Sequence, residues 1–168
     1  TLVHSSTFAN FWANSTTDSL CSLDAGIYHH GQPFVMFDHL SGRWVVADVA
    51  YENIDDGPYF VCVAVSNGLA VDPAIQYFDA PYWYYYALST NQGNIEYYPD
   101  APKLGLWPDG YYLSIDTLDV FNNGFNRTPR GVKVWALNRE DMIAGGNPVG
   151  SGDFRYHDFH LSEQLGYE

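Results

Sequence analysis

The sequence predicts an all-β protein made of antiparallel, four-stranded, blade-like repeats, the architecture of an incomplete β-propeller, with a β-sandwich as the alternative. Three observations predict this class. Fifteen Gly and nine Pro interrupt the 168-residue chain about every seven residues, which suits short strands and turns. Short runs of apolar, β-branched and aromatic residues lie between these interruptions. One hairpin pattern also occurs twice.

The chain has the length of a single domain, residues 1–168, and is long enough to bury a core. Within this domain we expect a polar lead-in anchored by aromatic residues, then two repeat units, then a tail or the start of a third unit. These segments are residues 1–30, 31–99, 100–146 and 147–168.

Four runs in the first unit predict strands. Pro33 stands at a strand start, where proline is tolerated, and the Asp, Ser and Gly of residues 38–43 predict a hairpin turn. The third run is apolar on both faces, which predicts a central strand. The predicted strands are Phe34–Phe37, Trp44–Tyr51, Tyr59–Ser66 and Tyr82–Ser89.

The second unit begins with another hairpin, whose turn is the Trp-Pro-Asp-Gly sequence of residues 107–110. Residues 119–131, rich in Asn and Gly, predict a loop. The run Arg139–Gly146 predicts a helical turn that a pair of glycines ends. The predicted strands are Lys103–Leu106, Tyr111–Ile115 and Val132–Asn138.

The two units align in the same order. Pro33, Val35 and Phe37 match Pro102, Leu104 and Leu106 at an offset of 69 residues. A deletion of one residue in the turn then matches Gly42, Trp44 and Asp48 with Gly110, Tyr112 and Asp116, and Ala64 matches Ala136 further on. The shared order of hairpin, long loop and strand indicates one structural unit used twice.

The charge balance restricts the partners. Seven Lys+Arg against twenty Asp+Glu give a formal net charge of −13. Phosphate backbones and anionic membranes both need cationic patches, so we expect no nucleic-acid and no membrane partner. An acidic surface can attract cations such as Ca²⁺, although a solvated acidic coat is the commoner explanation, and we expect no cofactor.

Two features predict an extracellular protein. Asn14 and Asn126 begin sequons in polar, turn-like surroundings that could accept a glycan. The two cysteines, Cys21 and Cys62, are compatible with one disulfide, and the alternative is a pair of buried thiols.

Several segments resemble one family. Residues 31–48, "GQPFVMFDHLSGRWVVAD", resemble a segment of secreted microbial β-propeller-like proteins of largely unknown function, and residues 59–66 and 100–114 resemble the segments that follow in that family. The resemblance covers Gly31 to Gly145 and implies a β-propeller fold and an extracellular setting, without implying a reaction. Gln32 stands where the family pattern commonly has Asp. A propeller needs at least four blades, so we expect other copies of this chain, or the rest of a longer chain, as partners.

Aromatic residues provide the first candidate site. Flat rings can stack on the apolar faces of sugars, so they point to a carbohydrate-binding surface. Alternation along a strand places half of such rings in the core instead. The candidate ligand-binding residues are Trp83, Tyr85, Trp107 and Tyr111.

Polar clusters provide the other candidates. His29, His30 and Arg43 could supply the base and the carboxylate-neutralising cation of a polysaccharide lyase, with Asp38 nearby as a turn residue. The stretch that contains His157, Asp158 and His160 would need a loop to hold a metal, because a strand points the two histidines to opposite faces. We therefore assign no metal site.

Two functions remain open from the sequence. The first is a secreted, glycosylated binding or assembly module that has carbohydrate as a candidate ligand and catalyses no reaction. The second is an extracellular carbohydrate-active enzyme, either a lyase or a glycoside hydrolase. An enzyme requires ionisable groups that converge in a cleft, whereas a module requires exposed faces that associate.

Overall fold

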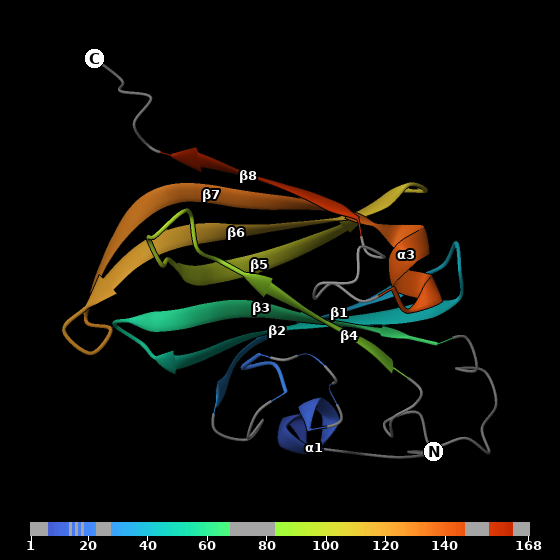
Figure 1. The fold of residues 1–168 in the computed structure, drawn as a ribbon, viewed down its shortest axis with the longest axis horizontal. Helices are drawn as coiled ribbons and strands as arrows, with labels where there is room; N and C mark the ends of the chain where they lie inside the picture. The colour runs from blue at the N-terminus through green and yellow to red at the C-terminus, as the bar shows by residue number, and fades with distance from the viewer. Residues whose placement is uncertain are drawn as a thin grey trace.

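The protein consists of two four-stranded antiparallel sheets packed face to face (Figure 1). A computed structural model of the chain describes residues 7–13, 15, 17, 19–22, 28–67, 83–146 and 155–162. Strands follow one another in chain order in both sheets. The prediction of an all-β chain built from four-stranded antiparallel sheets is confirmed.

The first sheet contains β1 (His29–Asp38), β2 (Arg43–Asn53), β3 (Gly57–Ser66) and β4 (Trp83–Ser89). The second sheet contains β5 (Tyr98–Leu106), β6 (Gly110–Phe121), β7 (Asn126–Asn138) and β8 (Tyr156–Ser162). Among the described residues, the short helices α1 (Phe8–Trp12) and α3 (Arg139–Ala144) accompany them. The stretch assigned above to the tail or to a third unit thus contains the edge strand of the second sheet.

The expected loop after the second hairpin is instead a long β-hairpin. Strand β6 continues to Phe121 and β7 starts at Asn126, and the two strands pair to their ends. Asn122 and Asn123 adopt positive φ at the tip, a conformation that Asn tolerates better than most residues. The Asn-rich composition that predicted a loop therefore belongs to a turn of a few residues.

The main core lies between the two sheets. Strand β3 is buried on both faces, as its apolar sequence predicted. Buried side chains from both sheets, together with Met142 of α3, form one cluster. Its largest members are Tyr86, Tyr111, Leu113, Ile115, Trp135 and Leu137.

A second core covers part of the outer face of the first sheet. Phe11 and Trp12 of α1 pack on Trp83 and Tyr85 of β4, on the side of the sheet away from β5–β8 (Figure 1). A disulfide joins Cys21 to Cys62, which confirms the predicted pairing. It fastens to β3 the segment that carries α1, namely the described residues between 7 and 22, which we call the α1 segment.

The bulges of β1 and β5 fix how the two sheets correspond. In each strand the ladder shifts at a residue of positive φ, 60° at Gln32 and 47° at Ala101, and a proline follows, Pro33 or Pro102. Positive φ is uncommon outside glycine, so these bulges are equivalent features. They stand 101 − 32 = 69 residues apart, the offset of the sequence alignment.

The second strands correspond at an offset of 67 residues, whereas the sequence alignment assigned 68. Phe37 pairs with Trp44 in the first hairpin, and Leu106 pairs with Tyr111 in the second. Six residues separate the first pair and four separate the second, so the second turn is shorter by two residues rather than one. The counterpart of Trp44 is therefore Tyr111, not Tyr112.

The ladders extend this correspondence across both sheets. Ala64 pairs with Val46 and Trp135 pairs with Leu113, so the counterpart of Ala64 is Trp135 and not Ala136. Pairing of the edge strands then matches β4 with β8, residue by residue over the whole length of both.

Equivalent residues lie on opposite sides relative to the shared core. Val35 is 58% exposed, whereas its counterpart Leu104 is 9% exposed and belongs to the core. Tyr86 is buried between the sheets, whereas its counterpart Phe159 is 51% exposed. The two sheets thus pack head to tail, each using a different face. A sandwich with a two-fold axis would bury the same face of both.

A buried ion pair joins the first hairpin to α3. Asp38 Oδ2 accepts hydrogen bonds from Arg139 Nε (2.7 Å) and from the Tyr111 hydroxyl (2.7 Å), and Asp38 is fully buried. Burial by itself raises the pKa of Asp38, but the hydrogen bonds from Arg139, Ser41 and Tyr111 outweigh it and hold that pKa well below its usual range. Asp38 is therefore ionised, and its ion-pair partner is Arg139.

We expect Asp38→Asn to lower the free energy of unfolding by about 3–5 kcal/mol, because it leaves the Arg139 charge buried without a carboxylate. Urea unfolding measures the effect. Asp119→Asn is the matched control, since the Asp119–Arg130 pair is largely exposed, and it should cost at most about 1 kcal/mol. Equal effects of the two variants would contradict the structural role given to Asp38.

Candidate functional site

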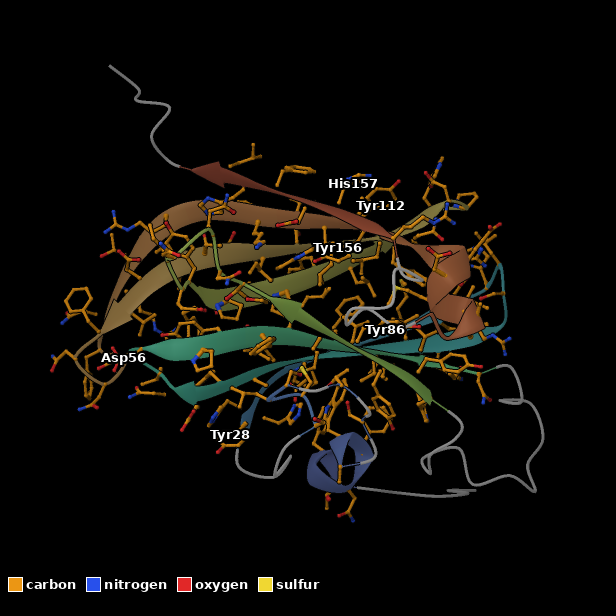
Figure 2. All side chains as sticks on the ribbon, in the orientation of Figure 1. Tyr28, Asp56, Tyr86, Tyr112, Tyr156 and His157 are labelled. Atoms are coloured by element: carbon orange, nitrogen blue, oxygen red, sulfur yellow. A yellow bond between two sulfur atoms is a disulfide. The ribbon has the colours of Figure 1, made fainter. Side chains whose placement is uncertain are left out.

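An open depression lies at the end of the first sheet, around the turn between β2 and β3. It measures about 740 Å³, large enough for a sugar unit or two. Asp56 marks its position in Figure 2, at the end of the molecule opposite α3. The lining residues are His30, Tyr51, Glu52, Asn53, Ile54, Asp56 and Gly57.

A stacked pair of rings forms one side of the depression. The imidazole of His30 lies 3.8 Å from the Tyr51 ring, at an angle of 16°, and Nε2 of His30 lies 3.0 Å from the Tyr51 carbonyl oxygen. Tyr51 is supported from behind by Tyr59 and Tyr98, whose rings lie 6.0 and 5.6 Å from it. His30 is exposed, so an aromatic surface on a fixed support faces the solvent.

The turn that forms the opposite side is attached to the second sheet. Both carboxylate oxygens of Asp55 accept backbone hydrogen bonds from the β6–β7 hairpin, from Asn123 N (2.8 Å) and Gly124 N (3.0 Å). Ile54 lies so close to Gly124 that a Cβ atom there would fall 2.7 Å from the isoleucine. Gly124 also has a φ of 77°, a conformation that favours glycine, so this contact suits glycine.

The depression is rich in hydrogen-bond acceptors. Glu52 and Asp56 contribute carboxylates, and the Asn53 amide donates to Asp56 across the turn (3.3 Å). Burial, with smaller contributions from the charges of Asp56 and Asp55, raises the pKa of the supporting Tyr59. This tyrosine therefore stays neutral at physiological pH. The arrangement suits a ligand that offers hydroxyl or amino donors and an apolar face.

His29 lies on the other side of the sheet from His30. Its ring stacks on Trp12 (5.0 Å, 8°), and its Nδ1 lies 2.9 Å from Asp48 Oδ2 in a pair whose side chains are almost fully buried. Trp12 Nε1, His29 Nε2 and Asp48 Oδ1 have no hydrogen-bond partner among the residues that the structure describes. The α1 segment covers this pair, so it does not reach the depression.

Arg43 is remote from both histidines. It starts β2 at the hairpin end, whereas Tyr51, the partner of His30, lies eight residues further along the strand. At about 3.3 Å per residue this is roughly 26 Å. The predicted lyase cluster of His29, His30 and Arg43 is therefore not assembled: the structure separates the three side chains.

Three of the four predicted ligand-binding rings are buried. Trp83 and Tyr85 lie under the α1 segment, and the Tyr111 hydroxyl is bonded to Asp38 in the main core. Trp107 alone among the four is exposed, at 67%, in the β5–β6 turn. Alternation along β4 directs Trp83 and Tyr85 to one face and Tyr84 and Tyr86 to the other, but packed segments cover both faces.

Of the residues that line the depression, the sequence points to His30 alone, as part of the lyase cluster. Tyr51 ends a predicted strand, and Glu52, Asn53 and Asp56 lie between two predicted strands. The useful signal was an aromatic residue followed at once by acidic and amide residues at the turn of a hairpin. The contribution of His30 depends on its stacking across two strands, which no local pattern shows.

The other predicted sites are also located. Asn126 is exposed at the start of β7, where a glycan fits without disturbing the core, whereas Asn14 lies outside the described residues. On β8, His157 faces the outside of the second sheet, and His160 packs on Tyr97 (5.1 Å). In the part of the chain that the structure describes, no three His, Cys, Asp or Glu side chains form a group suited to a metal. None of its helices is long and apolar enough to cross a membrane.

Comparison with known proteins gives no match. No family model, no curated protein and no solved structure is significantly similar to this chain. The resemblance noted in the sequence thus remains a prediction, and the function has to be argued from the geometry.

The environment of His160 predicts a pH dependence of stability. Burial, and next the charge of Lys133, lower the pKa of His160 in the folded protein. The unfolded chain therefore binds a proton more readily than the folded one, so the free energy of unfolding should fall as the pH decreases below about 6.5. Urea unfolding at pH 7.5 and pH 5.5 measures this change.

His160→Gln should reduce the loss between these two pH values, because glutamine does not titrate. His39→Gln serves as the control, since His39 is exposed in the first hairpin. The same pH dependence in the wild-type protein and His160→Gln would show that His160 is not responsible.

Proposed function

We propose that this protein is a secreted, glycosylated binding module of the β-propeller type, and that it holds carbohydrate in the depression at the β2–β3 turn. The observation that carries the proposal is the stacked His30–Tyr51 pair, which lines the depression together with Glu52, Asn53 and Asp56. Stacking on the apolar face of a sugar ring and acceptance of hydrogen bonds from its hydroxyls is the usual chemistry of such sites.

The packing of the sheets supports the propeller type. In a propeller, each blade packs one face on the next blade and the opposite face on the previous one. With only two blades present, one member of each pair of equivalent residues is therefore buried between the blades and the other is exposed. Val35 and Leu104 differ in this way, and so do Tyr86 and Phe159. The first strands β1 and β5 approach each other directly, as innermost strands do, with Gln32 accepting a hydrogen bond from Ala101 N (2.8 Å).

Two features support an extracellular setting. The Cys21–Cys62 disulfide persists best in an oxidising compartment. The Asn126 sequon lies exposed on the β6–β7 hairpin, beside the turn that lines the depression. A binding role also accounts for the separation of His29, His30 and Arg43, because an acid–base reaction needs such groups within reach of one substrate.

The acidic rim indicates which sugars fit. Glu52 and Asp56 would repel uronates and sulfated sugars, whereas hydroxyl and amino groups would donate to them. We therefore expect neutral or amino sugars as ligands, and not the uronates on which a lyase acts.

We expect His30→Ala to weaken oligosaccharide binding about tenfold, because it removes one stacking surface worth about 1–1.5 kcal/mol. Isothermal titration calorimetry measures the affinity for neutral and amino-sugar oligosaccharides. The ligands are oligosaccharides of glucose, galactose and glucosamine. His39→Ala is the matched control, an exposed histidine in the first hairpin. Failure of all these sugars to bind the wild-type protein, or equal binding by His30→Ala, would refute the proposal.

A further inference from the structure

The outer face of the second sheet is apolar and uncovered over β7 and β8. Phe159 and Leu161 are 51% and 58% exposed there, and the ladder places them opposite Val134 and Val132 on the same face. Figure 2 shows Tyr112 and His157 on this side of the sheet, away from the first sheet. Neighbouring apolar side chains on one open sheet face are typical of a contact surface.

The correspondence of the sheets indicates what this face is built to contact. Phe159 and Leu161 are the counterparts of Tyr86 and Leu88, which are buried against the second sheet. Val134 is likewise the counterpart of Val63, which is fully buried in the same core. The outer face of the second sheet thus repeats the pattern of a face that another sheet covers.

The complementary face is present on the same chain. Leu104, Leu106 and Tyr111 of the second sheet pack toward the first sheet, and their counterparts are Val35, Phe37 and Trp44. These three counterparts are exposed on the outer side of β1 and β2. Phe37 and Trp44 pack on each other there, with ring centroids 5.0 Å apart.

The α1 segment leaves part of this second face accessible. It covers positions on β2, β3 and β4, including Ala50, Ala64 and Tyr85, but not Val35 or Phe37. Within the chain, a hydrogen bond from the backbone N–H of Ala101 to the side-chain Oε1 of Gln32 links β5 to β1. The uncovered strand β1 is the counterpart of β5, the strand that makes this contact.

We propose that the outer face of the second sheet, around Phe159 and Leu161, binds the outer β1–β2 face, around Val35 and Phe37, of a second copy of this chain. The contact follows the head-to-tail packing of the two sheets within one molecule, but it is confined to the β1–β2 part of the outer face, because the α1 segment covers Ala64, the counterpart of the core residue Trp135. It is heterologous, because two different surfaces meet, and it can therefore continue from copy to copy until a ring closes. Propellers have about four to eight blades, so a ring needs about two to four copies. The inference goes beyond carbohydrate binding and does not require it.

The charge of the protein sets the conditions for association. Each copy carries a formal charge of −13, so copies repel one another at low ionic strength. Burial of the two apolar faces provides the attraction, which salt does not screen. Association should therefore strengthen from 20 to 300 mM NaCl, as measured by sedimentation velocity over a range of protein concentrations.

Two double variants test the contact. Val35→Lys/Phe37→Lys removes the first-sheet face, and Phe159→Lys/Leu161→Lys removes the second-sheet face. Each adds positive charge to an acidic protein and so reduces the general repulsion between copies; a loss of association must then come from the lost apolar contact. Phe125→Lys is the control, since Phe125 is 83% exposed at the β6–β7 turn, away from both faces.

We expect each double variant to be monomeric by itself, whereas Phe125→Lys associates like the wild-type protein. A mixture of the two double variants should form a dimer and nothing larger, because each retains the face that the other lacks. Near-UV circular dichroism and the thermal midpoint check that the variants are folded.

Three results would overturn the proposal. A wild-type protein that stays monomeric up to about 1 mM in 300 mM NaCl would exclude a second copy as the occupant of these faces. Association that survives in either double variant would place the contact elsewhere, including a contact between two identical faces. A mixture that stays monomeric would show that the two faces do not bind each other. Oligosaccharide titration is a separate measurement, so its failure and the failure of self-association are distinguishable.

Discussion

The structure depends on a single constraint: both faces of each sheet carry apolar side chains, so each sheet needs a cover on two sides. Strand β3 shows this most clearly, since Val63 faces the second sheet and Cys62 faces the α1 segment, and both are fully buried. The second sheet covers one face of the first, and the disulfide-linked segment covers part of the other. In the part of the chain that the structure describes, the outer face of the second sheet has no such cover over Phe159 and Leu161.

Polar contacts within the apolar core fix how the two sheets align. The Asp38 carboxylate must meet Arg139, and Gln32 must meet the backbone of Ala101. Lys133 of the second sheet reaches the carbonyl oxygens that follow β4, including that of Asn91 at 2.6 Å. A shift of either sheet would leave such groups buried without partners, at a cost of several kcal/mol for the charged ones. The apolar contacts hold the sheets together, and these polar contacts select one alignment.

The sequence predicts the parts of this fold that depend on local patterns, and it fails where one residue changes the face. The central positions of β1 to β4, the short helix at Arg139 and the Cys21–Cys62 pair follow from composition and turn residues, whereas the long β6–β7 hairpin and β8 do not. The alignment of the units erred by one residue at Trp44 and again at Ala64, because turns of different length hide the register. His29 and His30 are neighbours in sequence, yet a strand directs them to opposite faces, so their proximity did not indicate a shared site. The depression joins residues of two strands and one turn, and pairing across strands is not visible in a linear pattern.

The separation of the depression from the sheet faces has a consequence for binding. The depression opens at the ends of the strands, at the β2–β3 turn, whereas the proposed contact uses the broad faces of the sheets. Head-to-tail packing rotates each unit in the same sense, so every copy in a ring would present its depression, and the Asn126 sequon beside it, at the same end. If the proposed sugar sites lie on one end of such a ring, they would bind a polymeric glycan together, because once one site is occupied the others act at high local concentration. A shallow, open site of modest affinity is then sufficient, provided that the faces hold the copies together.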